Sequence, residues 1–329
     1  MANARPCWCA ALALIGGLLG SSAGATQEGE LAASSQSLLL DDSRFVREAA
    51  LDRLQQIRFA FREPKAEADE QPVWLRGYGH RGSLDGEGPA GRVEEQGGGA
   101  FVGLDRAFGD TWVAGVLAGY SQLDVDLDGA AADVDIDSYH LGAYAAMRYY
   151  NQLGLKLGAA FSDDRLDSRS GDDDGRRWQA FAEGVYAMDF ETATLEAFAN
   201  LAYVALHSDG LDGAAWVVDS EERQVTFSTL GWRYATRFDL SAEQRLIARA
   251  SLGWRHAFGD TEARTDGVLL ADGSRFHSRG VALSEDSLRL DLGADYGVTP
   301  TSYIGLFYLG QYADAARDNG LSARLSLRF

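Results

Sequence analysis

Apolar and polar side chains alternate, residue by residue, in segment after segment from residue 72 to the C-terminus. In the segment 153–162, Leu155, Leu157 and Phe161 fall on one face of an extended chain, and Lys156 falls on the other. Because a β-strand sends successive side chains to opposite sides, this period of two predicts strands with one apolar and one polar face. We expect such strands at residues 73–81, 96–108, 111–126, 134–149, 152–165, 177–189, 193–207, 224–238, 243–257, 286–297, 301–312 and 319–329.

The connections between these segments alternate in length. Tight turns are expected at residues 109–110, 150–151, 190–191, 240–241 and 298–300, and longer polar loops near residues 82–95, 127–133, 166–176, 208–223, 258–285 and 313–318. Bacterial outer-membrane barrels combine an even number of antiparallel strands with short periplasmic turns and long extracellular loops. About 12 strands sorted in this way predict an all-β fold, a 12-stranded antiparallel transmembrane β-barrel. A charge facing lipid at mid-bilayer costs ~2–4 kcal/mol, so the charged strand faces should line the lumen.

The first 25 residues have the features of a secretory signal peptide. Arg5 provides the positive charge, and residues 9–20 form an apolar run too short to span a membrane. Ala23 and Ala25 fit the small-x-small cleavage pattern, so Thr26 would begin the mature chain. Cleavage would also remove both cysteines, which excludes disulfides and cysteine-based zinc sites from the mature protein.

The net charge of −19 disfavours nucleic acid as a partner, because nucleic-acid binding needs a basic surface. Many acidic residues flank or occupy the long loops, as in Asp124 to Asp137 and Asp172 to Asp174. We expect a solvated acidic rim that faces outer-membrane lipid and lipopolysaccharide. Calcium binding is the alternative, but Asp135 stands where a calcium loop has its bidentate glutamate. We expect neither a metal site nor a cofactor.

One helix is expected before the first strand. Val46, Ala50 and Leu54 recur on one stripe with the period of an α-helix, and Asp42 or Ser43 would cap its N-terminus. About 17 helical residues extend ~25 Å at a rise of 1.5 Å each, which equals the ~25 Å height of a barrel's apolar band. This match favours an N-terminal α-helix threaded through the lumen. A periplasmic or surface helix outside the pore is the alternative.

The mixed charges of this helix would need partners inside the barrel, because a buried charge is costly unless it is paired. We therefore expect contacts between the helix and the wall of the lumen. They would join the helix residues Arg47, Glu48, Asp52 and Arg53 to the wall residues Lys156, Glu183, Glu196, Arg249, Arg289 and Asp291.

Several short motifs occur in a characteristic order along the chain. They are Trp74-Leu-Arg-Gly-Tyr-Gly79, Gly103-Leu-Asp105, Gly115-Val-Leu-Ala-Gly-Tyr120, Asp137-Ser-Tyr-His-Leu-Gly-Ala-Tyr144 and the terminal Phe329. With these motifs the chain resembles the β-domain, or translocator, of autotransporters, the type V secretion proteins. The resemblance covers residues 37–329 if residues 44–54 are the family's linker helix.

The resemblance implies a monomeric barrel in the outer membrane of a Gram-negative bacterium, with the linker helix inside the pore. It also implies insertion by the barrel-assembly machinery with the help of periplasmic chaperones. The machinery would read the last strand through Gly320, Leu325, Leu327 and Phe329.

The expected division of the chain is a signal peptide at 1–25, a short residual passenger or tail at 26–41, a linker helix and connector at 42–71, and the barrel at 72–329. The barrel would carry its own N-terminal segment to the cell surface, with no catalytic residues of its own. Two alternatives from other classes are a surface adhesin or receptor with acidic loops, and a barrel hydrolase built around His207 and Asp209.

Deletion of Phe329 should lower the amount of assembled barrel in the outer membrane, because the terminal aromatic belongs to the expected assembly signal. Outer-membrane fractionation with heat-modifiable migration in gels measures this amount. Normal assembly and normal surface levels of the deletion variant would contradict the assignment.

Overall fold

The computed structural model describes residues 9–60, 72–86, 91–109, 111–127, 133–149, 152–168, 171–212, 216–241, 244–299 and 301–327. Three parts of the sequence expectations lie outside these ranges. They are Arg5 of the signal segment, the connector after residue 60 and the terminal Phe329.

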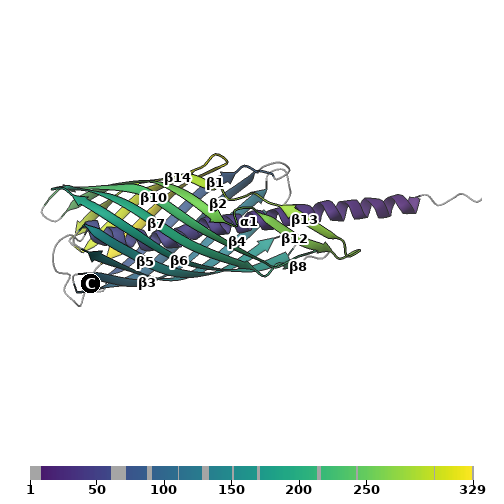
Figure 1. Cartoon of the computed structure of the whole chain (residues 1–329), viewed down its shortest axis with the longest axis horizontal. Coiled ribbons are helices and arrows are strands. Elements are labelled where there is room, and N and C mark those ends of the chain that lie inside the picture. Colours follow the sequence, from purple (N-terminus) through teal and green to yellow (C-terminus); the bar gives the residue numbers. More distant parts are fainter. Residues whose placement is uncertain are drawn as a thin grey trace, which may run out of the picture.

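Twelve antiparallel strands form a closed barrel, drawn with its axis close to horizontal in Figure 1. They are β1 (Val73–Leu84), β2 (Val93–Phe108), β3 (Trp112–Leu127), β4 (Asp133–Tyr149), β5 (Leu153–Ser168), β6 (Gly171–Asp189), β7 (Ala193–Ser208), β10 (Glu221–Asp239), β11 (Arg245–Gly259), β14 (Asp286–Thr299), β15 (Ser302–Tyr312) and β16 (Ala316–Leu327). Barrel strands that follow one another in the sequence are also neighbours in the barrel, and the last strand, β16, pairs with the first, β1, to close it. The 12-stranded antiparallel barrel expected from the sequence is confirmed.

The two ends of the barrel differ. At one end, here called the turn end, short connections such as the one between Phe190 and Ala193 join the strands. In another of these turns Gly109 has a φ of +63°, a left-handed conformation that favours glycine. At the opposite end, the loop end, several connections are longer, and most strands extend a few residues further than the alternation predicted. The long loop expected near residues 166–176 is wrong, because β5 continues to Ser168 and pairs with β6 from Gly171 onward.

In the part of the chain that the structure describes there is one helix, α1 (Cys9–Ala60), which runs along the barrel axis and projects beyond the loop end (Figure 1). The expected start at Asp42 or Ser43 is wrong. The Ser43 hydroxyl donates to the Leu40 carbonyl at 2.7 Å, a bond within the helix and not a cap. The helix continues through the segment expected to be a tail because Leu38, Leu39 and Leu40 are buried against the barrel interior. In the described part of the chain, no helix is both long and apolar enough to cross a membrane.

A second, small sheet stands at the loop end and was not predicted. It consists of β8 (Leu211–Asp212), β9 (Trp216–Val218), β12 (Arg264–Leu269) and β13 (Arg275–Arg279), in the order β13-β12-β9-β8. Its strands come from two long loops that the sequence predicted as irregular. The pairing of Val217 with Val268 joins the two loops.

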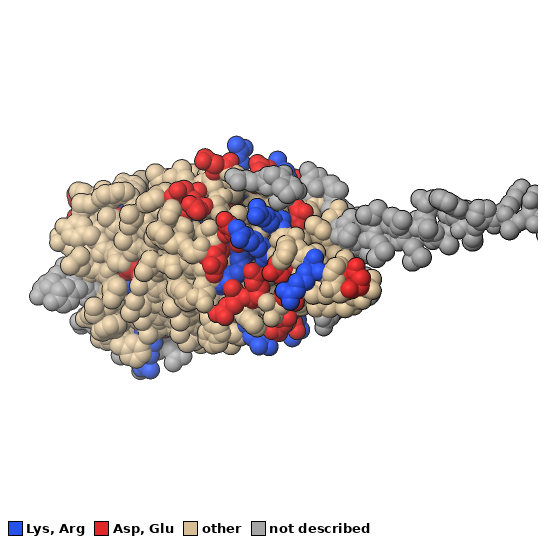
Figure 2. Space-filling model, turned by 45° about the vertical axis from the view of Figure 1, so that its right-hand side comes forward, with Lys and Arg blue, Asp and Glu red and all other residues tan. Residues whose placement is uncertain are grey.

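Apolar side chains cover the outside of the barrel, and polar side chains point inward. Leu155 and Leu157 are exposed while Lys156 between them is buried, as the alternation predicted. Exposed aromatic residues gather toward the turn end (Phe108, Trp112, Tyr186, Phe190, Tyr234 and Phe238) and toward the loop end (Tyr120, Tyr139, Trp178, Tyr203, Trp254 and Phe258). Two such girdles mark the interfaces of a membrane-spanning barrel. Figure 2 shows charged side chains concentrated near the loop end, beside a largely uncharged surface.

Val116 lies midway between Trp112 and Tyr120 on the outer face of β3, and 56% of it is exposed. Substitution of Val116 by arginine should lower the free energy of unfolding by ~2–4 kcal/mol, because it places a charge in the lipid. Leu270→Arg is the matched control, since Leu270 is exposed in the turn after β12, in the small sheet. Urea unfolding in lipid bilayers measures both variants. Equal stabilities of the two would contradict the assignment of the apolar band.

Candidate functional site

The lumen is filled by α1, which is buried on all its faces from about residue 37 to residue 56. Its apolar residues belong to the main hydrophobic core, with Phe45 and Leu54 among them. Its charged residues are buried too: Arg47 is 3% exposed and Glu48 is 8% exposed. A buried charge needs a partner, so the contacts of these side chains define how the helix is held.

Arg53 anchors the part of α1 near the turn end to the strands beside β1. Its Nε atom lies 2.6 Å from Asp105 Oδ2 on β2, and its Nη1 atom donates to the Ser326 hydroxyl on β16 at 2.6 Å. Asp105 also accepts a hydrogen bond from the Tyr144 hydroxyl at 3.2 Å. One guanidinium of α1 thus binds the strands on both sides of β1, next to the closing seam of the barrel.

On the opposite side of the barrel wall, Arg58 of α1 lies 3.4 Å from Glu196 on β7. Glu196 belongs to a wall cluster in which Lys156 and Arg233 both contact Glu183, at 2.8 Å and 2.6 Å. The expected wall residues Lys156 and Glu183 therefore pair within the wall. They support Glu196, which makes the contact with the helix.

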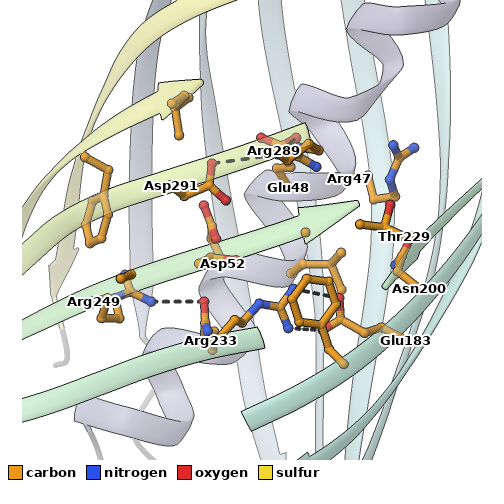
Figure 3. A pocket seen from close by; sticks show the side chains of 18 of the residues that line it. Arg47, Glu48, Asp52, Glu183, Asn200, Thr229, Arg233, Arg249, Arg289 and Asp291 are labelled. Carbon is orange, nitrogen blue, oxygen red and sulfur yellow. Dashed lines mark hydrogen bonds and ion pairs between the residues drawn. The ribbon is translucent and has the colours of Figure 1, made fainter. Parts of the chain in front are cut away.

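Halfway along the lumen, two carboxylates of α1 face arginines of the wall (Figure 3). Glu48 pairs with Arg289 on β14, and Asp291 on the same strand lies 3.9 Å from Arg289. Asp52 lies 3.3 Å from Arg76 on β1 and 3.8 Å from Arg324 on β16. Each of these three carboxylates therefore has at least one guanidinium group within 3.9 Å.

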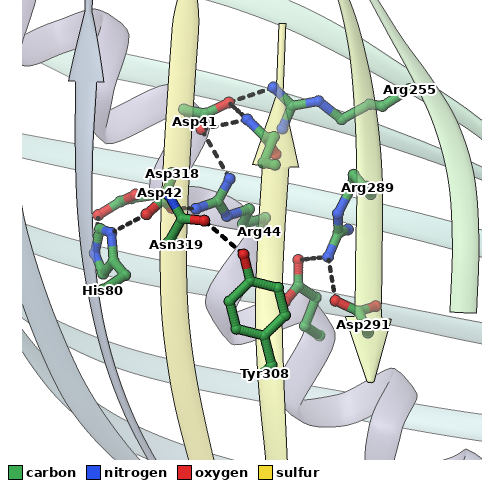
Figure 4. A network of polar contacts seen from close by, with 12 residues as sticks. Asp41, Asp42, Arg44, His80, Arg255, Arg289, Asp291, Tyr308, Asp318 and Asn319 are labelled. Atoms are coloured by element: carbon green, nitrogen blue, oxygen red, sulfur yellow. Dashed lines mark hydrogen bonds and ion pairs between the residues drawn. The ribbon is translucent and has the colours of Figure 1, made fainter. Parts of the chain in front are cut away.

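Closer to the loop end, α1 presents both signs of charge (Figure 4). Asp41 pairs with Arg255 on β11, and Arg44 pairs with Asp318 on β16. Arg44 also lies 3.1 Å from Asp41, so the two pairs form one network.

Polar wall residues also bind the backbone of α1. The Gln179 side-chain amide donates to the Ser43 carbonyl at 2.9 Å, and its oxygen accepts from Arg47 at 3.1 Å. Arg177 donates to the Leu39 carbonyl and is itself held by Asp164 at 2.7 Å. These bonds fix the rotation of the helix as well as its height in the lumen.

Beyond the barrel mouth, the loop end also contacts α1, at residues 26–34. The Ser278 hydroxyl on β13 donates to the Thr26 carbonyl at 3.0 Å, and the Val281 amide donates to the Ser34 hydroxyl at 3.0 Å. From the β1–β2 connection, the Gly91 amide donates to Glu30 at 2.7 Å. The small sheet and this loop therefore form a collar around residues 26–34, a feature with no signal in the sequence.

Some of the expected contacts between helix and wall are present in the structure, and others are absent from its described part. Glu48 meets Arg289, and Arg249 donates to Gln55 of α1 at 3.4 Å while pairing with Asp295 at 2.7 Å. The contacts of Arg47, Asp52 and Arg53 are instead to wall residues that the sequence analysis did not select. They are Gln179, Arg76, Arg324 and Asp105.

The arrangement leaves little free space. A cavity of about 50 Å³ remains between α1 and the wall, lined by Arg47, Asp52 and Arg249 among others (Figure 3). Such a volume holds a few waters. A second polypeptide segment does not fit beside the helix, so the structure represents a plugged barrel.

The pair of His207 and Asp209, considered for a barrel hydrolase, lies together at the loop end, and Ser208 between them does not join it. His207 lies 3.2 Å from Asp209, and both are about half exposed. The hydroxyl of the intervening Ser208 donates to Asp173 at 2.6 Å and is turned away from the imidazole. A nucleophile needs a base within hydrogen-bond reach, and this serine has a carboxylate as its acceptor instead.

Comparison with known proteins gives one consistent result. The family model for the autotransporter β-domain matches residues 73–308. The barrel is similar to the translocator domain of the autotransporter NalP from Neisseria meningitidis, with a TM-score of 0.65, 17% identity and coverage of 89% of this chain and 99% of that one. It is also similar to the β-domain of the Bordetella autotransporter BrkA, with a TM-score of 0.61, 19% identity and coverage of 79% and 100%.

Among curated proteins, an extracellular serine protease of Serratia marcescens is 29% identical over 318 residues. The alignment covers 92% of this chain and 30% of the relative, so the chain spans about a third of the relative's length. The structural likenesses show a shared fold, and the family match identifies which kind of barrel it is.

Substitution of Arg53 by alanine should destabilise the barrel by about 3–5 kcal/mol, because it leaves the Asp105 carboxylate buried without its cation. The matched control is Arg92→Ala, which removes a half-exposed ion pair with Asp85 and should cost about 0–1 kcal/mol. Denaturant unfolding in detergent micelles measures both. Arg53→Ala with the stability of the control would contradict the anchoring role of this contact.

Proposed function

The chain belongs to the autotransporter β-domain family of Gram-negative outer-membrane barrels, and on this premise we propose how it works. The part of α1 that fills the lumen, about residues 37–56, is here called the lumen helix. The barrel carries the segment N-terminal to the lumen helix across the outer membrane. The helix then remains in the lumen as a plug. The observation that carries this proposal is the direction of α1 through the barrel.

The direction follows from the ends of the helix. α1 ends at Ala60 near the turn end, where β1 starts at Val73, and its N-terminal part leaves through the loop end (Figure 1). Outer-membrane barrels place their short turns in the periplasm and their long loops outside. The segment that precedes the helix is therefore delivered to the outside of the cell.

The ion pairs between α1 and the wall of the lumen support the proposal that the helix remains in the lumen as a plug. A helix that enters the pore exchanges water for the wall's charges, and each pair compensates the cost of burial only once the geometry is complete. The contacts of Arg53, Asp52 and Arg44 span the lumen from the turn end toward the loop end. Together they hold the helix at one height, which stops the movement and closes the pore.

The signal peptide and the tail fit the same scheme. Cleavage after Ala25 would leave a helix from Thr26, and this helix keeps all the lumen contacts described above. Residues 26–41 would then be the most distal part of the chain, with residues 26–34 held in the collar by Ser278 and Val281 and residues 37–41 inside the mouth of the barrel. We propose that this segment and anything joined to its N-terminus are the cargo.

Assembly is proposed to use the closing strand. β16 turns Leu321 and Ala323 toward lipid and Ser322 and Arg324 toward the lumen, and it pairs with β1 along its whole length. Its lipid-facing stripe, which includes Leu325 and Leu327, is the surface that the barrel-assembly machinery and periplasmic chaperones would bind. Gly320 lies on the inward face, against His80.

The barrel itself takes no catalytic part in this proposal. The Serratia marcescens relatives are extracellular serine proteases, and this chain aligns with 30% of their length. Any activity of a cargo would lie in residues N-terminal to the lumen helix, on the cell surface.

An epitope tag placed directly before Thr26 should be removed by protease added to intact cells, because that end of α1 emerges at the loop end. The same tag after Glu191, in the turn between β6 and β7, is the control and should be cut only after lysis. Blotting for the tag measures both. A tag at Thr26 that stays protected on intact cells would contradict delivery to the surface.

A further inference from the structure

Three potential metal ligands converge at the seam of the barrel. His80 on β1, Glu95 on β2 and Asp318 on β16 place one ligand atom each within 4.8 Å of one another. Among the described residues, they are the one group of three or more histidine, cysteine, aspartate or glutamate side chains with such spacing. All three are buried, with exposures of 6%, 4% and 6%.

Two ligand atoms in this group lack the hydrogen bonds that buried polar atoms normally have. In the described part of the chain, neither His80 Nε2 nor Glu95 Oε2 has a hydrogen-bond partner. His80 Nδ1 lies 3.3 Å from Asp318 Oδ1, and Nε2 lies 3.5 Å from Asp42 Oδ2 on α1 (Figure 4). Asp42 Oδ1 is likewise without a hydrogen bond. An orphaned buried polar atom indicates a missing ion or water.

The charge around the group is unbalanced. Arg44 contacts both Asp41 and Asp318, and Arg255 contacts Asp41. Asp42 and Glu95 make no ion pair with an arginine among the described residues. The neighbourhood therefore holds four carboxylates, of Asp41, Asp42, Glu95 and Asp318, and two guanidinium groups. A carboxylate buried without a cation is costly, and a divalent cation would supply positive charge beside Glu95 and Asp42, whose one other close partner within the described ranges is the His80 imidazole.

Two glycines have no side chain where the side chains of His80 and Glu95 lie, and so make room for them. A Cβ atom on Gly97 of β2 would collide with His80 Nε2, and one on Gly82 of β1 would collide with the Glu95 carboxylate. Gly82 faces Glu95 across the β1–β2 pairing, and it faces Asp318 across the β1–β16 pairing. The backbone of the seam is thus shaped around these side chains.

We propose that His80, Glu95 and Asp318 bind a divalent cation of the zinc class, with Asp42 of α1 as the fourth ligand. Zinc is bound tetrahedrally by imidazole nitrogen and carboxylate oxygen at about 2.0–2.2 Å. His80, Glu95 and Asp318 lie on three neighbouring strands of the sheet, and Asp42 Oδ2 of α1 lies 3.5 Å from His80 Nε2. The cation connects β1, β2 and β16 with the helix, so it links the closing strands of the barrel to the plug at one point.

Isothermal titration of the untagged full chain with ZnCl₂, after dialysis against EDTA, tests the site. We expect one zinc per chain. His80→Gln and Glu95→Gln should each weaken binding by more than the roughly 10–100-fold that loss of an outer-shell partner costs. His207→Gln, which removes an exposed histidine outside the group, is the matched control and should bind as the parent does.

Thermal unfolding provides a second readout that does not depend on the titration. Zinc should raise the Tm of the parent chain and leave that of Glu95→Gln unchanged, while metal-free Glu95→Gln should be at least as stable as the metal-free parent. Absence of stoichiometric zinc binding by the parent would overturn the proposal. Equal zinc binding by the parent, His80→Gln and Glu95→Gln would overturn it as well.

Discussion

The ion pairs between α1 and the inward faces of the strands are the interaction on which the rest of this structure depends. A strand period of two that gives lipid an apolar surface necessarily sends the polar half of each strand into the lumen. Charges such as Asp105, Arg76 and Arg324 are then buried, and each would be costly without a partner. The helix supplies Arg53 and Asp52 at the heights where those partners lie. The polar lumen and the charged helix are therefore two halves of one electrostatic arrangement.

This arrangement also links assembly to function. Arg53 and Arg44 both reach β16, the strand that closes the barrel against β1. The helix thus stabilises the pairing of β16 with β1, and these two strands in turn hold the helix in place. The proposed cation at His80 and Glu95 would add a third connection at the same junction. Beyond the mouth, the collar orients the emerging segment away from the membrane surface.

Alternation alone predicted eleven of the twelve strands to within three residues, because a period of two is a local property of the sequence; β6 begins six residues earlier than predicted, at Gly171. Helix periodicity placed Val46 and Leu54 inside the lumen, but Ser34, Ser35 and Ser37 weakened the signal upstream, and only burial against the barrel extends α1 there. Partners such as Asp105 and Asp318 were missed because the rotation of the helix against the wall decides them. The collar was missed for the same reason, since the pairing of Val217 with Val268 joins loops far apart in the sequence.

Single-channel conductance in planar bilayers tests the central claim most directly, namely that α1 plugs the lumen. The chain beginning at Thr26 is compared with a variant that lacks residues 26–60, after both are shown to form closed barrels by heat-modifiable migration. Because about 50 Å³ of free space remains beside the helix, the chain with the helix should conduct poorly. The variant without it should open a wide, stable pore. Equal conductance of the two proteins would contradict the account and place the helix outside the lumen.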